Sequence, residues 1–149
     1  MGKRRLSREL TLQFLYSCDI NLNFTSEDLD SFWILVKDAH HITDENFFSS
    51  IVYTFANTII HGILENLDNI DNIIKTYATN WTFSRITIVD RNLLRMAIYE
   101  ILYMPDIPPV VSIDEAVDIA KKYSTPDSGK FVNGVLDKVK NEISKNKQI

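Results

Sequence analysis

The fold class can be predicted from one stretch, residues 87–102, TIVDRNLLRMAIYEIL. Thr87 is suited to cap a helix, and the apolar residues after it recur at three- and four-residue spacing, as on the buried face of a helix. Pro105 then ends the helix. The expected apolar face comprises Leu93, Leu94, Ala97, Ile98, Ile101 and Leu102.

The same periodicity extends outward from this stretch in both directions. With only four glycines and four prolines in 149 residues, it predicts an all-α fold of about seven helices. We expect a single domain, residues 1–149, built from two packed helical subdomains of about residues 1–80 and 81–149, which meet near the link at residues 81–87.

Local signals predict where several helices begin. The first is expected over residues 6–19, and Thr25 with Ser26 should begin the second. Thr43 is suited to cap a third, with Asp44 and Glu45 in its first turn. We expect the long helical stretch that follows to divide into two helices near Gly62. A capping box from Ser112 to Glu115 should begin a later helix, and Pro126 should be the first residue of the last one.

Composition excludes several classes of function. Cys18 is the only cysteine, so an internal disulfide or a cysteine-based zinc site is not expected, and inert core is its simplest role. His40 and His41 are adjacent, so their side chains would point in different directions on a helix, and His61 stands alone. No pair of histidines is therefore spaced to bind a metal. Without a glycine-rich phosphate loop or a long apolar run, we expect a cytoplasmic protein with no catalytic residue, metal, cofactor or membrane span.

Charge is distributed unevenly along the chain. The net charge is −4, yet Lys3, Arg4, Arg5 and Arg8 all precede the first acidic residue. Arg5 and Tyr16 lie on one expected helix face with Glu9 and Leu12, and Gln13 neighbours Tyr16. Guanidinium groups bind phosphates and a tyrosine ring stacks on unpaired bases, so this end is suited to single-stranded RNA. A solvated helix end is the alternative.

Three blocks in the second half resemble successive signatures of the NusB family of transcription antitermination factors. They are DRNLLRMAIYE at residues 90–100, VSIDEAV at residues 111–117 and DSGKFVNGVLDK at residues 127–138. The arginines, Gln13 and Tyr16 are similar to that family's basic first helix, although Leu6 stands where some relatives have another arginine. Residues 20–80 are similar in length and helical pattern only.

The resemblance implies a non-enzymatic bacterial factor with two helical subdomains. Such a factor pairs with NusE, a ribosomal protein of the small subunit, binds the boxA element of nascent ribosomal RNA and joins an antitermination complex on RNA polymerase. By resemblance, the RNA surface comprises Lys3, Arg4, Arg5, Arg8, Gln13, Tyr16, Asp127, Lys130 and Phe131. The implied NusE surface comprises Asp90, Arg95 and Glu100.

Alternatives remain for individual residues and for the whole chain. Phe131 also fits the apolar stripe of the last helix, and Asp127 is also a favourable acid at a helix start. The rival function is that of a NusB-like substrate-binding domain of a ribosomal RNA cytosine methyltransferase, although no region patterned as a methyl-donor domain is present. A protein scaffold without RNA contact is a second rival, and the sequence leaves monomer or homodimer open.

Overall fold

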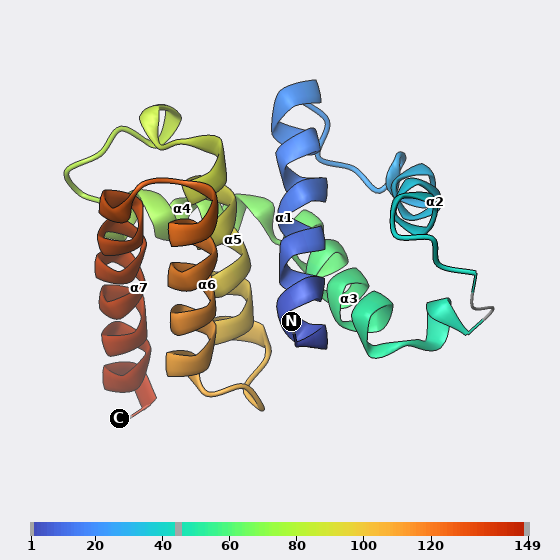
Figure 1. Cartoon of the computed structure of the whole chain (residues 1–149). Helices are drawn as coiled ribbons and strands as arrows, with labels where there is room; N and C mark the ends of the chain where they lie inside the picture. The colour runs from blue at the N-terminus through green and yellow to red at the C-terminus, as the bar shows by residue number, and fades with distance from the viewer. Residues whose placement is uncertain (1, 44–45, 148–149) are drawn as a thin grey trace. The chain divides into compact units, whose positions relative to one another are not determined.

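The computed structural model describes residues 2–43 and 46–147, and within these ranges it contains α-helices and short 3-10 helices but no strand (Figure 1). The predicted all-α class and the seven α-helices are confirmed. The elements are α1 (Lys3–Asn21), α2 (Leu29–Ala39), η1 (Phe47–Ser49), α3 (Ile51–Glu65), α4 (Leu67–Tyr77), η2 (Phe83–Arg85), α5 (Ile88–Tyr103), α6 (Pro109–Tyr123) and α7 (Pro126–Lys147).

Two helix starts follow the sequence signals directly. The Thr87 side chain accepts a hydrogen bond from the Asp90 amide at 3.2 Å, which confirms it as the cap of α5. Pro126 is the first residue of α7, as predicted, and Thr125 accepts from the Ser128 amide at 3.3 Å. Both signals act over three residues, so they do not depend on the rest of the fold.

Other starts differ from the prediction. Helix α2 begins at Leu29, because the Thr25 hydroxyl is held in a local turn by Asn23 and the Glu27 amide. Helix α3 begins at Ile51 rather than just after Thr43, and Asp44 and Glu45 lie outside the described residues. The predicted division of the following stretch into two helices is observed, but at Asn66, between α3 and α4, rather than at Gly62.

The capping box predicted from Ser112 is also wrong. Helix α6 begins at Pro109, whose fixed φ suits a first helical position, so Ser112 lies inside the helix. Its hydroxyl donates to the Glu100 carboxylate at 2.9 Å rather than capping its own helix.

The chain divides into two compact units, unit 1 (Met1–Glu65) and unit 2 (Asn66–Ile149). The division lies earlier than the expected one at residues 80 and 81, because α4 belongs to unit 2. Ile70 and Ile74 of α4 are fully buried, and α4 contacts α5 and α7. The apolar periodicity continues from α3 into α4 without a break, so it did not indicate that α4 packs on the helices of unit 2.

Unit 1 is built around the contact of α1 with α3. Trp33 of α2 is 2 % exposed and lies edge-to-face with Phe47 and Tyr53 at centroid separations of 5.9 and 5.0 Å. Such aromatic pairs add to the stabilisation that apolar burial provides. The buried cluster consists of Leu10, Phe14, Cys18, Leu29, Trp33, Val36, Phe47, Ala56 and Ile60.

In unit 2, α5, α6 and α7 lie side by side and α5 contacts each of the other three helices (Figure 1). Leu93, Leu94, Ala97 and Ile98 of α5 are fully buried, as the opening stretch predicted. Gly129 lets α7 approach α6, because a Cβ there would lie 3.2 Å from Cγ of Lys121. None of the helices in the described ranges has the length and apolar character needed to cross a bilayer.

Candidate nucleic-acid interface

The first turn of α1 carries basic side chains at the positive end of a helix dipole. Lys3 and Arg4 are exposed and Arg5 is half-buried. The N-cap residue Gly2 provides no side-chain cap, and the first turn contains no acidic residue. Cations are unfavourable at a helix N-terminus, whereas an anion is stabilised there by the dipole and the N–H groups. This end of α1 is therefore suited to an anionic ligand.

Phe55 of α3 orients two of the arginines. The guanidinium carbons of Arg4 and Arg8 lie 5.0 and 5.2 Å from the centroid of its ring. Arg4 remains exposed, but Arg8 is only 2 % exposed. The expectation that Arg8 belongs to an open phosphate-binding surface is therefore corrected, since the packing of α1 on α3 encloses its side chain. Phe55 itself was missed by the sequence analysis.

Further along α1, the expected common face is only partly open. Glu9 and Leu12 are buried, whereas Tyr16 is 44 % exposed and Gln13 is exposed. The spacing correctly places these four side chains on neighbouring turns, but two of them are buried and two are exposed. Gln13 and Tyr16 are the two side chains that this face offers to a ligand.

A second candidate surface lies at the start of α7 in unit 2. Asp127 and Lys130 are exposed, and Phe131 is half-buried rather than part of the closed core. The Phe131 ring lies edge-to-face with Trp81, with centroids 5.2 Å apart and planes at 64°. Trp81 is 55 % exposed. The sequence analysis missed it because it stands in an irregular link, yet an aromatic residue outside any apolar stripe was the available signal.

The three residues expected to meet a protein partner instead connect helices within unit 2. Asp90 is 6 % exposed and its carboxylate accepts from the Ser128 hydroxyl of α7. Glu100 is fully buried and accepts from Ser112 of α6. Asp90 is therefore not an exposed contact residue, because α7 covers it.

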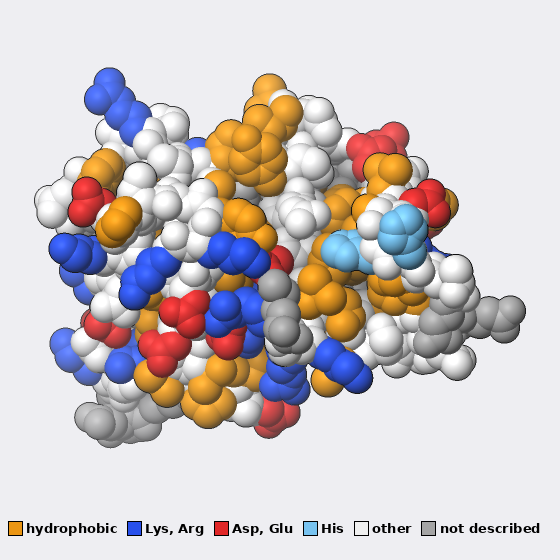
Figure 2. Space-filling view, viewed as in Figure 1, with side chains coloured by type: hydrophobic (Ala, Val, Ile, Leu, Met, Phe, Trp, Pro, Cys, Tyr) orange, Lys and Arg blue, Asp and Glu red, His pale blue; other side chains and the backbone are white. Residues whose placement is uncertain are grey.

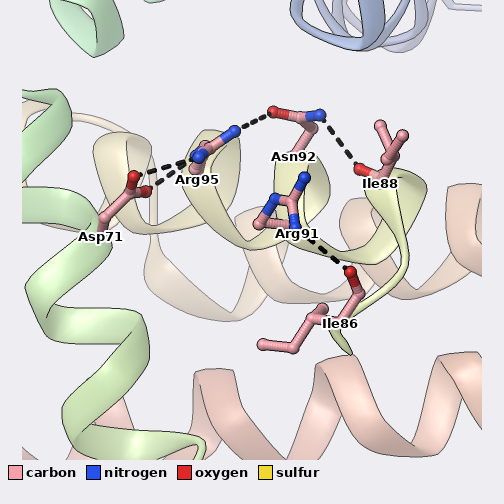
Figure 3. A network of polar contacts seen from close by, with 6 residues as sticks. All are labelled: Asp71, Ile86, Ile88, Arg91, Asn92 and Arg95. Carbon is pink, nitrogen blue, oxygen red and sulfur yellow. Dashed lines mark hydrogen bonds and ion pairs between the residues drawn. The ribbon is translucent and has the colours of Figure 1, made fainter. Parts of the chain in front are cut away.

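Arg95 makes the corresponding connection to α4. Its Nε and Nη2 donate to the two carboxylate oxygens of Asp71 at 2.7 and 3.0 Å, and Nη1 donates to Oδ1 of Asn92 at 2.8 Å (Figure 3). In the same view, Arg91 donates to the carbonyl of Ile86 at 3.4 Å. Arg95 is 3 % exposed, so this fork is part of the interior.

Over α6 and α7, at the left of Figure 2, basic and acidic side chains lie interspersed rather than gathered in one large field. Binding to a nucleic acid would therefore depend on local contacts, as the net charge of −4 also indicates. Among the residues that the structure describes, no group of three or more His, Cys, Asp and Glu is placed to hold a metal ion.

Comparison with known proteins decides the family. The model of the NusB family matches residues 5–141. The transcription antitermination protein NusB of Thermodesulfovibrio yellowstonii is 46 % identical over 97 % of both chains. This chain belongs to the NusB family. Its curated NusB relatives are named as transcription antitermination proteins, which are not enzymes.

Solved structures of NusB proteins have the same fold. NusB of T. maritima is 39 % identical, with a TM-score of 0.75 over 95 % of this chain and 92 % of the other. A structure of the antitermination factors NusB and NusE in complex with double-stranded RNA matches with 25 % identity and a TM-score of 0.76, over 95 % and 98 % of the chains. The expected NusB-like helical fold is confirmed.

Proposed function

We propose that this chain is a transcription antitermination factor that binds the boxA element of nascent ribosomal RNA together with NusE. In this role it joins the antitermination complex on RNA polymerase in the bacterial cytoplasm and supports transcription of ribosomal RNA operons. The observation that carries the proposal is the likeness, over 95 % of the chain, to a NusB solved with NusE and RNA.

The RNA contacts are proposed for both units. In unit 1, Lys3, Arg4 and Arg5 meet phosphates at the start of α1, and Gln13 and Tyr16 meet the next nucleotides. Arg8 supports this surface from the interior by sharing the Phe55 ring with Arg4. In unit 2, the proposed contacts are Asp127, Lys130 and Phe131.

We place the NusE contact on unit 2 around α5, with a changed role for the three residues first expected there. Asp90, Arg95 and Glu100 connect α5 to α7, α4 and α6. They would therefore shape the docking surface by fixing these helices, and exposed neighbours would touch NusE. Removing any of the three should then weaken unit 2 as well as the association.

An RNA titration with and without NusE tests the proposal. A boxA-like single strand should bind the chain alone weakly and the chain with NusE more tightly, while a scrambled strand of equal length should gain less from NusE. Binding of NusE with no effect on RNA affinity would favour a protein scaffold. No response to either partner would overturn the proposed function. Measuring the mass of the free chain in the same buffer separates monomer from homodimer.

A further inference from the structure

Helix α2 carries apolar side chains on two opposite faces. Its inner face places Leu29, Trp33 and Val36 in the buried cluster of unit 1. Its outer face carries Ile34 and Leu35, which are 60 % and 66 % exposed. A single exposed apolar residue is ordinary, but a helix that is apolar on all sides is normally buried on all sides. The outer face of α2 is therefore exposed although its central side chains favour burial.

Acidic residues flank this apolar pair. Asp30 and Asp38 are exposed and lie one turn before and one turn after Ile34, in the same row of the helix surface. Among the residues that the structure describes, neither carboxylate has an ion-pair partner. The helix dipole favours an acid at the start of α2 but disfavours Asp38 in its last turn. Local helix stability therefore does not account for both carboxylates.

The surroundings of the outer face are also negative and partly apolar. Residues 27–39 contain four acids and one base, Lys37. The Lys37 ammonium lies 5.0 Å from the centroid of the Phe48 ring, which is 49 % exposed and extends the apolar surface beside α2. An excess of negative charge repels nucleic acids and anionic lipids. The occupant that matches both the charge and the apolar centre is a basic, partly apolar protein surface.

We propose that the outer face of α2 is a docking surface for a protein partner that presents a basic amphipathic helix. The apolar residues of that helix cover Ile34 and Leu35, and its lysines or arginines meet Asp30 and Asp38. Helix α2 has 11 residues and is roughly 16 Å long, so about three turns of the partner helix cover it. The inference goes beyond the proposed function, because this face contains none of the residues proposed for RNA or NusE.

Synthetic helical peptides of about 14 residues test this surface on the full chain. The basic peptide has leucines at three- and four-residue spacing, with lysines on both sides of the leucine stripe. A second peptide has glutamates in place of the lysines, and a third has serines in place of the leucines. In fluorescence anisotropy, the basic peptide should bind at least about tenfold more tightly than either of the others.

A double variant removes the apolar centre without changing charge. Ile34→Gln with Leu35→Gln keeps residues that favour a helix, so circular dichroism should show a folded protein. Its affinity for the basic peptide should fall by roughly tenfold or more, because two apolar side chains no longer contribute to the contact. Val110→Gln changes an apolar residue of α6 that is 53 % exposed, and this control should bind the peptide as the wild type does.

A second double variant removes the charges and keeps the apolar centre. Asp30→Asn with Asp38→Asn should weaken binding of the basic peptide at low salt by roughly fivefold or more. Added salt should weaken peptide binding by the wild type, and this salt dependence should largely disappear in the variant. Asp114→Asn removes an exposed acid of α6 and should leave both the affinity and its salt dependence unchanged.

The outcomes separate this surface from the proposed function. If the glutamate or the serine peptide binds as tightly as the basic peptide, or if Ile34→Gln with Leu35→Gln has no effect, the docking surface is overturned. A homodimer of the free chain that this variant dissolves would also overturn it, because a second copy then covers α2. RNA and NusE should bind both double variants as they bind the wild type, so a failure here leaves the proposed function standing.

Discussion

Arg95 of α5 and Asp71 of α4 form a bidentate ion pair, with Nε 2.7 Å from Oδ1 and Nη2 3.0 Å from Oδ2. The two side chains are 3 % and 14 % exposed. A fork of this kind fixes the direction of both helices at their contact, because two parallel hydrogen bonds allow little rotation. Each of the other charged connections of α5 joins a different helix, so the packing of unit 2 depends on three separate polar contacts.

Breaking the Arg95–Asp71 pair should destabilise unit 2. Asp71→Asn leaves a buried guanidinium without this countercharge, and we expect a loss of about 3 kcal/mol in the free energy of unfolding. Urea denaturation followed by far-ultraviolet circular dichroism measures it. Asp137→Asn is the matched control, since Asp137 lies 4.0 Å from Lys140 in an exposed pair and should cost under about 0.5 kcal/mol. Equal effects would show that the buried fork contributes nothing beyond a surface pair.

Ser112 should matter for stability and not for helix capping. Ser112→Ala removes a donor from the buried Glu100 carboxylate, so we expect a loss of about 1–3 kcal/mol. Ser144→Ala, on the exposed side of α7, should change stability by less than about 0.5 kcal/mol. A Ser112→Ala protein as stable as the wild type would mean that the carboxylate does not need this hydroxyl.

Arg4, the exposed one of the two arginines at the Phe55 ring, should contribute to the salt dependence of RNA binding. If Arg4 contacts one phosphate, Arg4→Ala should reduce the slope of log affinity against log salt by about 0.7. Lys145→Ala removes the same charge from the exposed end of α7 and should leave the slope unchanged. If both variants reduce the slope equally, the effect comes from net charge. If Arg4→Ala leaves the slope unchanged, the Arg4 side chain is merely solvated.

Phe131 provides a test that separates RNA stacking from core packing. Because the ring is half-buried, we expect Phe131→Asp to remain folded with a modestly lower melting temperature. RNA affinity should fall by about 1–3 kcal/mol from lost stacking, with added repulsion of phosphate. Phe131→Leu keeps apolar packing without a π-face, so it should lose RNA affinity with little change in melting temperature. A sharp loss of folding in both variants would assign the ring to the core.

The accuracy of the sequence predictions follows the range of the interactions involved. The cap at Thr87 and the start at Pro126 depend on neighbours within three residues, and both were predictable. The Ser112 hydroxyl bonds a residue 12 positions away, so its local spacing with Glu115 was misleading. The role of such a side chain depends on a hydrogen-bond partner far away in the chain, and a single sequence does not show which distant residues the fold brings together.

The candidate site shows the same limit. The family resemblance implied that Asp90 and Arg95 meet a protein partner, and charged residues are usually exposed. Their burial is possible only because Ser128 and Asp71 reach them from other helices. Trp81 lies in a link without periodicity, so no pattern connected it to Phe131, 50 positions further along the chain.

The lone cysteine makes it possible to observe the opening of unit 1 chemically. Cys18 is 3 % exposed within the buried cluster of that unit, and no other thiol exists in the chain. A thiol reagent can therefore modify the protein only when this cluster opens, and the labelling rate reports the free energy of that local event. Unit 2 carries no thiol, so its own fluctuations would leave no mark in the mass spectrum.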